Sequence, residues 1–124
     1  MIVEAELEAI EPLWKSGLED AYEAYRGATA AMGEERGGKV ALAAALVEVA
    51  LDLQRLGRPA PPATDLLRGD LCLARASRLL ADTRDQRIQV AFARAIEEQS
   101  AAAAAQQASR PTRDRLLQAI AEAR

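Results

Sequence analysis

The chain has 124 residues, which is enough for one domain with one hydrophobic core. It contains one cysteine and no histidine. These counts exclude, within one chain, an internal disulfide, a zinc site of histidine and cysteine ligands, and a histidine-based catalytic triad. The formal net charge is −3, and neither half of the chain has the dense basic stripe of a nucleic-acid binder. We therefore expect no nucleic-acid partner.

Half of the residues are apolar, but only 3% are aromatic and alanine dominates the apolar half. Each alanine buries little area, so the helices must pack closely to gain about 25 cal/mol per Å² over a useful area. A thin core of this kind often leaves an apolar face for a partner, which favours an oligomer. The acidic start of the chain does not resemble a secretory signal, and no uncharged run is long enough to cross a bilayer. We expect a cytoplasmic protein without a membrane span.

Apolar residues recur at steps of three and four near the start of the chain, and this spacing predicts an amphipathic helix over 1–32. Pro12 interrupts the helix, which indicates a kink or a short break, and the pattern leaves open whether the helix is split there. The charged, glycine-rich segment GEERGG at 33–38 is expected to be a loop.

A second helix is predicted over 38–56, and it is apolar on nearly all sides. A helix of that kind lies at the centre of a core or inside an interface. Glu48 and Asp52 form an i, i+4 pair in this apolar context. Because a buried carboxylate is costly unless it is paired, these residues should meet arginines, a capping group or water. The alternative is that they hold a magnesium ion, which prefers oxygen ligands.

The second half of the chain begins with a proline-rich loop at 57–64. Helices are predicted after it at 65–81, at 84–107, where the sequence is rich in alanine, and at 112–124. Thr83 is expected to cap the helix that starts at 84. No strand pattern is present, so the prediction is an all-α single domain of five or six antiparallel helices.

Basic residues supply a second set of candidate ligand contacts. Guanidinium groups suit phosphate and diphosphate recognition because they donate two parallel hydrogen bonds. An ordinary solvated helix face is the other interpretation of such a series. The candidate diphosphate contacts are Lys39, Arg68, Arg75 and Arg78.

The segment from about Leu46 to Gln107 resembles the trans-prenyltransferases, the polyprenyl diphosphate synthases of isoprenoid metabolism. Those enzymes have an "RRGxPT" loop followed by a "GDYLLARAFELLA" helix, and this chain has GRPA at 57–60 and RGDLCLARASRLLAD at 68–82. The family's "DDxxD" motif, which binds the magnesium ions of the diphosphate substrate, is absent, and the chain is much shorter than a synthase. The positions in register are Gly69, Asp70, Leu73, Ala74, Arg75, Ala76, Leu79, Leu80 and Ala81.

The resemblance implies a truncated, non-catalytic relative with a fold like the N-terminal half of a prenyl synthase. Such a protein would act as an interaction or regulatory subunit, either as a homo-oligomer or paired with a full-length prenyl synthase, and would need no cofactor. One alternative is a self-associating helical module unrelated to prenyl synthases. A second alternative is a magnesium-dependent diphosphate-binding enzyme whose site, at a subunit interface, uses Glu48, Asp52 and Asp70 as metal ligands.

Overall fold

The computed structural model of the chain describes residues 10–54, 62–105 and 111–123. Over these residues the chain forms helices and short turns with no strand, so the all-α prediction is confirmed. None of the described helices is long and apolar enough to cross a membrane. The α-helices described are α2 (Glu19–Ala28), α3 (Glu34–Leu53), α4 (Ala63–Asp82), α5 (Gln86–Ala104) and α6 (Thr112–Glu122).

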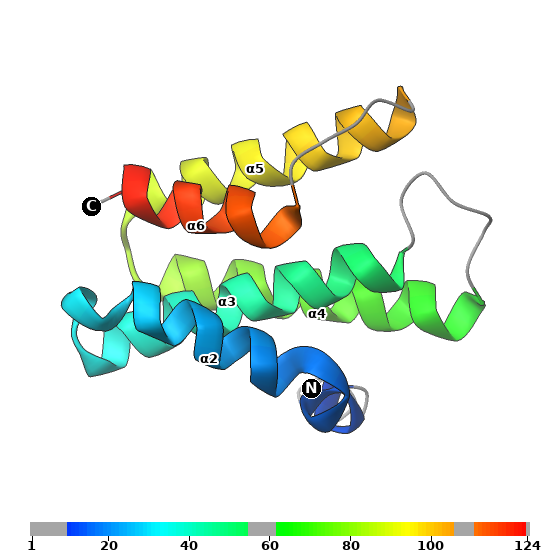
Figure 1. The fold of residues 1–124 in the computed structure, drawn as a ribbon, viewed down its shortest axis with the longest axis horizontal. Coiled ribbons are helices and arrows are strands. Elements are labelled where there is room, and N and C mark those ends of the chain that lie inside the picture. Colours follow the sequence, from blue (N-terminus) through cyan, green and yellow to red (C-terminus); the bar gives the residue numbers. More distant parts are fainter. Residues whose placement is uncertain (1–9, 55–61, 106–110, 124) are drawn as a thin grey trace.

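The helices form one compact bundle around α3. Figure 1 shows α3 and α4 side by side along the middle of the molecule, with α2 across one side of them and the pair α5 and α6 on the other. The most extensive helix–helix contacts are those of α3 with α4, α2 with α3 and α5 with α6. The bundle therefore has α3 in contact with helices from both halves of the chain.

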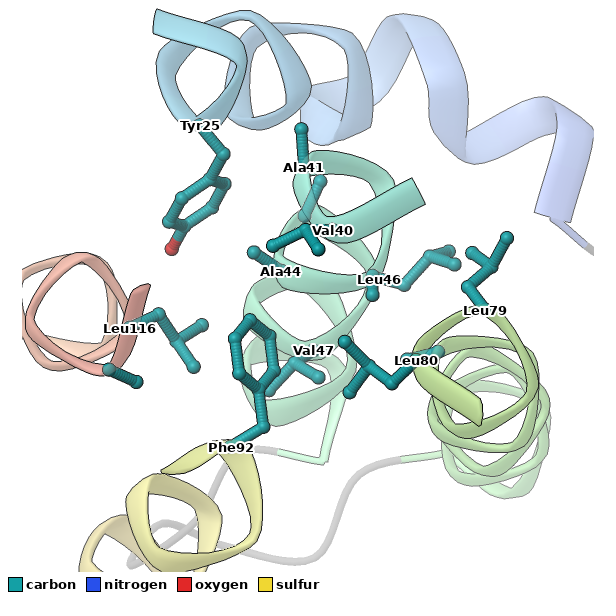
Figure 2. Close-up of a cluster of buried hydrophobic side chains, with 14 of the residues drawn as sticks. Tyr25, Val40, Ala41, Ala44, Leu46, Val47, Leu79, Leu80, Phe92 and Leu116 are labelled. Carbon is teal, nitrogen blue, oxygen red and sulfur yellow. The ribbon is translucent and has the colours of Figure 1, made fainter. Parts of the chain in front are cut away.

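The core is built on α3, as its apolar sequence predicts. Its residues from Ala43 to Val47 are all buried, as are Val40 and Ala41. Figure 2 shows α3 in the middle of the cluster, with larger side chains arriving from every other α-helix. These include Tyr25 from α2, Leu79 and Leu80 from α4, Phe92 from α5 and Leu116 from α6. The alanines of α3 leave room for these side chains, and Val40, Leu46 and Val47 of α3 fill the interior with them.

The described segment before α2 is bent, and this bend lies after Pro12 in the chain. Pro12 sits in the first turn of a short 3₁₀ segment, Glu11–Leu13, where its missing N–H leaves no bond unmade. The backbone leaves helical geometry later, at Ser16 and Gly17, and Gly17 has a φ of 134° that a side chain would disfavour. The predicted helix over 1–32 is therefore broken at Gly17, and α2 ends at Ala28. Residues 1–9 of that prediction lie outside the described residues.

The loop predicted at 33–38 is wrong, because α3 already begins at Glu34. Gly33, with a φ of 88°, ends the preceding turn, and two acidic residues follow it in the first turn of α3, where the helix dipole favours them. Gly37 lies inside the helix against α2. A Cβ at Gly37 would come within 2.6 Å of the Thr29 carbonyl oxygen, so its role is close packing and not chain flexibility.

Two further boundaries differ from the prediction. Helix α4 begins at Ala63, two residues earlier than expected, while residues 57–61 of the proline-rich loop lie outside the described residues. Thr83 does not cap the next helix. The cap is Asp85, whose carboxylate accepts a hydrogen bond of 3.0 Å from the backbone N–H of Arg87, and α5 starts at Gln86. Residues 106–107 at the end of the predicted 84–107 helix are likewise outside the described residues.

Candidate functional site

A polar cluster joins α6 to α2 and α3 around Glu48. The Glu48 carboxylate accepts hydrogen bonds of 2.9 Å from both Nε and Nη2 of Arg113, a bidentate ion pair. It also accepts the hydroxyl of Tyr25 at 2.8 Å. The sequence-based expectation that Glu48 meets an arginine is confirmed. We refer to Glu48, Arg113 and Tyr25 as the Glu48 cluster.

The surroundings of Tyr25 and Arg113 in the Glu48 cluster keep both side chains protonated. Burial raises the pKa of Tyr25 well above its ordinary value, and the negative charge of Glu48 beside the hydroxyl raises it further. The hydrogen bonds to Glu48 raise the pKa of Arg113. Tyr25 is therefore a neutral hydrogen-bond donor and Arg113 a fixed cation. Neither group is poised to exchange a proton near neutral pH.

Arg113 extends the cluster towards α2. Its Nη2 lies 3.3 Å from Oδ2 of Asp20, and its guanidinium carbon lies 6.0 Å from the centre of the Tyr25 ring. Asp20 is largely exposed, so solvent weakens that ion pair. The contact with Glu48 is therefore the stronger of the two ion pairs that Arg113 makes.

A second ion pair fixes α6 to α5. Arg115 donates from Nε to Oε2 of Glu98 at 2.5 Å and from Nη2 to Oε1 at 3.1 Å. The Arg115 residue is only 4% exposed, and these hydrogen bonds raise its pKa. Its Nη1 is buried and has no hydrogen-bond partner in the described part of the chain. This ion pair therefore joins a buried arginine to a glutamate that is mostly exposed to solvent.

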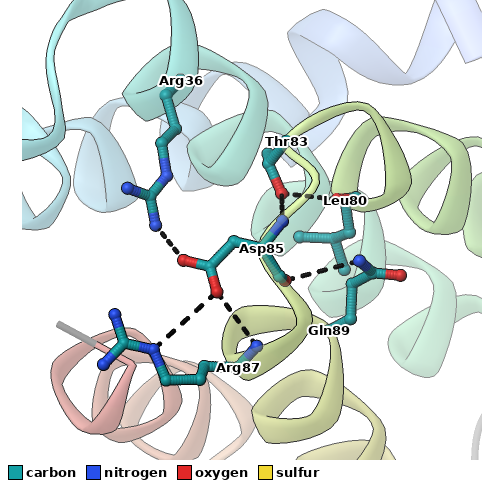
Figure 3. Close-up of polar contacts among 6 residues, drawn as sticks. All are labelled: Arg36, Leu80, Thr83, Asp85, Arg87 and Gln89. Atoms are coloured by element: carbon teal, nitrogen blue, oxygen red, sulfur yellow. Dashed lines mark hydrogen bonds and ion pairs between the residues drawn. The ribbon is translucent and has the colours of Figure 1, made fainter.

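At the opposite end of the bundle, the turn between α4 and α5 carries a third polar cluster, shown in Figure 3. The Asp85 carboxylate forms an ion pair with Arg36 of α3 while it caps α5. Thr83 supports the turn, because its hydroxyl donates to the Leu80 carbonyl oxygen at 2.5 Å and accepts from the Asp85 N–H at 3.3 Å. Arg84 has a φ of 55°, which completes the sharp change of direction. The cluster thus ties a tight turn to the start of α3.

The candidate metal ligands are not brought together. Glu48 is occupied by Arg113 and Tyr25, and Asp70 accepts a hydrogen bond of 3.1 Å from the side chain of Gln54. Asp52 is exposed on α3. In the parts of the chain that the structure describes, no three His, Cys, Asp or Glu side chains lie close enough to hold a metal ion. Glu48 and Asp70 therefore form hydrogen bonds within the bundle in place of a shared metal site.

Lys39 lies in a shallow hollow of about 380 Å³ at the start of α3. Glu35 is 3.7 Å from the Lys39 ammonium group. The lining is mixed in charge, with two basic and three acidic side chains, so positive charge is not concentrated there. The charged residues that line the hollow are Arg36, Lys39, Glu34, Glu35 and Asp82.

The candidate arginines lie along α4 and do not line that hollow. Arg75 and Arg78 line a separate hollow of about 220 Å³ together with Asp82. Arg68 is two turns before Arg75 and lines neither hollow. The hollows therefore do not combine the four candidate diphosphate contacts, and an acidic residue accompanies each group of bases.

The Gly69-Asp70 pair, the most motif-like part of the sequence, has a packing role. A Cβ at Gly69 would lie 2.9 Å from Cγ of Gln54 and 3.3 Å from the carbonyl oxygen of Ala50, so α3 and α4 approach closely here. Cys72, one turn later, is buried, and burial raises its pKa to about 11. A thiol with a raised pKa is a poor nucleophile. Gly69 and Cys72 are thus buried within the bundle, while Asp70 is exposed.

The opposite side of α4 faces solvent, and Leu67 is exposed on it. Leu67 is 59% exposed, more than Leu66 and Val90, the other exposed large apolar side chains among the described residues. Residues at steps of four and three from Leu67 lie on the same side of the helix. We call this set the outer face of α4: Leu67, Leu71, Ala74, Arg78 and Ala81. Leu71 is half-buried and the other members are exposed.

Comparison of the chain with protein-family models, curated protein sequences and solved structures found no match. The resemblance to prenyl synthases therefore rests on the sequence of α4 and the segments beside it, and it stays a prediction. Sequence reasoning identified Glu48 but not Arg113 or Arg115. The charged run Arg113, Asp114 and Arg115 is the only local signal there. Nothing in that run indicates that the partner of Arg113 lies 65 residues earlier in the chain.

Proposed function

We propose that this chain is a non-catalytic helical protein that acts by binding another protein chain through the outer face of α4. The exposure of Leu67 carries the proposal. A leucine that is 59% exposed at the start of a 20-residue helix leaves apolar surface in water. Burying this leucine against another protein chain would remove its apolar surface from water, and that burial favours association.

The use of the polar groups supports a binding role over a catalytic one. Glu48 and Asp70 hold helices together, and Cys72 is a buried thiol whose pKa is raised. The side chains that the sequence offered as candidate reactive groups, Glu48, Asp70 and Cys72, thus take part in hydrogen bonding or packing within the bundle. The outer face of α4, in contrast, has no such internal task for its apolar side chains.

The partner that the sequence predicts is a full-length prenyl diphosphate synthase. The outer face lies within RGDLCLARASRLLAD at 68–82 and the residue before it, the segment with the closest resemblance to that family. A regulatory subunit that resembles its partner can pair with it as the partner's own subunits pair with each other.

A capture experiment tests the proposal with two matched variants. Leu67→Glu places a charge on the outer face of α4, and Val90→Glu places the same charge at an apolar residue of α5 that is 41% exposed. Extracts of the source cell are passed over the wild-type chain and both variants, and the retained proteins are identified by mass spectrometry. We expect a prenyl synthase on the wild type and on Val90→Glu but not on Leu67→Glu. Identical protein sets on all three chains would contradict the proposal.

A further inference from the structure

Helices α5 and α6 lie side by side and run in opposite directions, and we call the pair the α5–α6 hairpin (Figure 1). We propose that this hairpin is a hinged cover over α3, which opens as one unit about the turn between α4 and α5 while α2, α3 and α4 stay folded. Opening uncovers apolar side chains of α3 that the closed bundle hides from water. The inference does not use the outer face of α4, so it stands apart from the proposed function.

The described helices divide into two units by their contacts. Helix α5 packs against α6 more extensively than either of them packs against α2, α3 or α4. Within the hairpin Arg115 also pairs with Glu98, and the hydroxyl of Thr112 donates to Oε1 of Gln99 at 3.3 Å. The contacts of α3 with α4 and with α2 hold the other unit together. Parts of a native protein that open cooperatively often coincide with supersecondary motifs such as this hairpin.

The turn between α4 and α5 is suited to act as the hinge. Only Thr83, Arg84 and Asp85 separate the two helices, and Arg84 has a φ of 55°. A hinge consists of a few residues in a loop or at the end of a helix that take up the change in backbone angles. The ion pair between Asp85 and Arg36 lies at this turn. It therefore sits at the pivot, where it can persist while the more distant parts of the hairpin move.

The ion pair between Arg113 and Glu48 acts as the latch. Arg113 lies at the start of α6, away from the hinge, and its two hydrogen bonds of 2.9 Å to Glu48 reach across to α3. Opening the hairpin has to break these bonds. The Arg113 side chain is 36% exposed and that of Glu48 is 23% exposed. Water can therefore replace the pair, which keeps the energetic cost of opening the latch moderate.

Apolar side chains between the hairpin and α3 favour the closed form. Phe92 of α5 and Leu116 of α6 point towards the side of α3 that carries Ala44 and Val47 (Figure 2). All four residues are at most 1% exposed in the closed bundle. Opening exposes them to water, which disfavours the open form. The open form is therefore a minor state of the free chain, and its population depends on the latch.

Hydrogen–deuterium exchange of the backbone amides of the full chain, followed by NMR in low concentrations of guanidinium chloride, tests the inference. The slowest amides of α5 and of α6 should share one opening free energy, because one event releases both helices. Isolated helices of this length are marginal in water, so these amides exchange once the hairpin has left α3. The slowest amides of α3 and α4 should have a higher opening free energy. A common value for all four helices would overturn the inference, and so would different values for α5 and α6.

Two mild variants separate hairpin opening from global unfolding. Arg113→Met removes a contact that both events break, so exchange should rise by one common factor, about fivefold, in all four helices. Leu46 points towards Leu79 of α4 and away from the hairpin (Figure 2), so opening keeps this contact. Leu46→Val should therefore raise exchange about fivefold in α3 and α4 and leave α5 and α6 unchanged. An equal rise in α5 and α6 for Leu46→Val, or no rise there for Arg113→Met, would overturn the inference.

Discussion

The Glu48 cluster and the outer face of α4 use their residues in opposite ways. In the cluster, charged and polar groups are drawn into the bundle and satisfied by one another. On the outer face, leucine and alanine are left in water beside a single arginine. Polar groups in the interior stabilise the fold only when each has a partner, whereas apolar groups on the surface gain from a partner that comes from outside. The comparison separates the part of the molecule that holds the fold from the part that is available for binding.

Among the substitutions that test this comparison, Glu48→Ala should have the largest effect on the free energy of unfolding. The variant leaves Arg113 and the Tyr25 hydroxyl without their shared acceptor, and the free energy of unfolding should fall by about 2 kcal/mol, because solvent screens the partly exposed ion pair. Chemical denaturation measures the loss. Glu48→Gln is the control, because it keeps an acceptor of similar shape, and it should cost less. A loss below about 0.5 kcal/mol for Glu48→Ala would show that the cluster is not structural.

Alkaline pH should weaken the cluster next. The pKa of Tyr25 in the fold is raised above its ordinary value of 10, so above pH 10 the unfolded chain loses a proton that the folded chain keeps. The unfolding free energy should therefore fall as pH rises from 10, by about 1 kcal/mol per pH unit. Tyr25→Phe should lack this part of the slope. Denaturation at pH 9, 10 and 11 provides the comparison, and equal slopes in the two chains would refute the assignment.

Arg115→Met should have a smaller effect than Glu48→Ala. It removes a buried cation whose Nη1 has no partner within the described residues, and it leaves Glu98 mostly exposed to solvent. We expect a loss of about 1 kcal/mol in the unfolding free energy, because the lost ion pair is partly offset by the removal of a desolvated charge. Thermal unfolding measures it. A loss as large as that of Glu48→Ala would mean that α6 is attached mainly through α5.

Leu67→Glu should have the smallest effect on stability. The side chain is mostly exposed in the monomer, so the unfolding free energy of the diluted chain should change by less than about 0.5 kcal/mol. The measurement is made at a concentration where the chain is monomeric. Val90→Glu should behave in the same way. A large loss from Leu67→Glu alone would show that this leucine belongs to the core and not to a binding surface.

The sequence predicted the helical class and the core helix because both depend on periodic apolar spacing. It failed at GEERGG, where local glycine signals favour a loop but packing against Thr29 requires the small residue inside α3. It also placed the cap on Thr83, whereas Asp85 gains both a helix cap and an ion pair with Arg36. The ion pair joins residues 49 positions apart in the chain, and local patterns carry no record of it.

The candidate site shows the same limit more clearly. The apolar surroundings of Glu48 correctly indicated that it needs a partner, but they could not identify Arg113, which lies 65 residues later. The exposed side of α4 could not be separated from its buried side either, because leucines occur on both. The resemblance to prenyl synthases drew attention to Gly69 and Asp70, and both are used in contacts with α3.

Residue-resolved NMR spectra of the isotope-labelled chain, recorded with and without an added full-length prenyl synthase, test the central claim most directly. If the outer face of α4 is where this protein binds that chain, the backbone signals of Leu67, Ala74 and Ala81 will change most when the synthase is added. The signals of Tyr25 and Arg113 will change least, because the Glu48 cluster is complete within one copy. Changes centred on the Glu48 cluster, or spectra that the synthase leaves unaltered, would contradict the account.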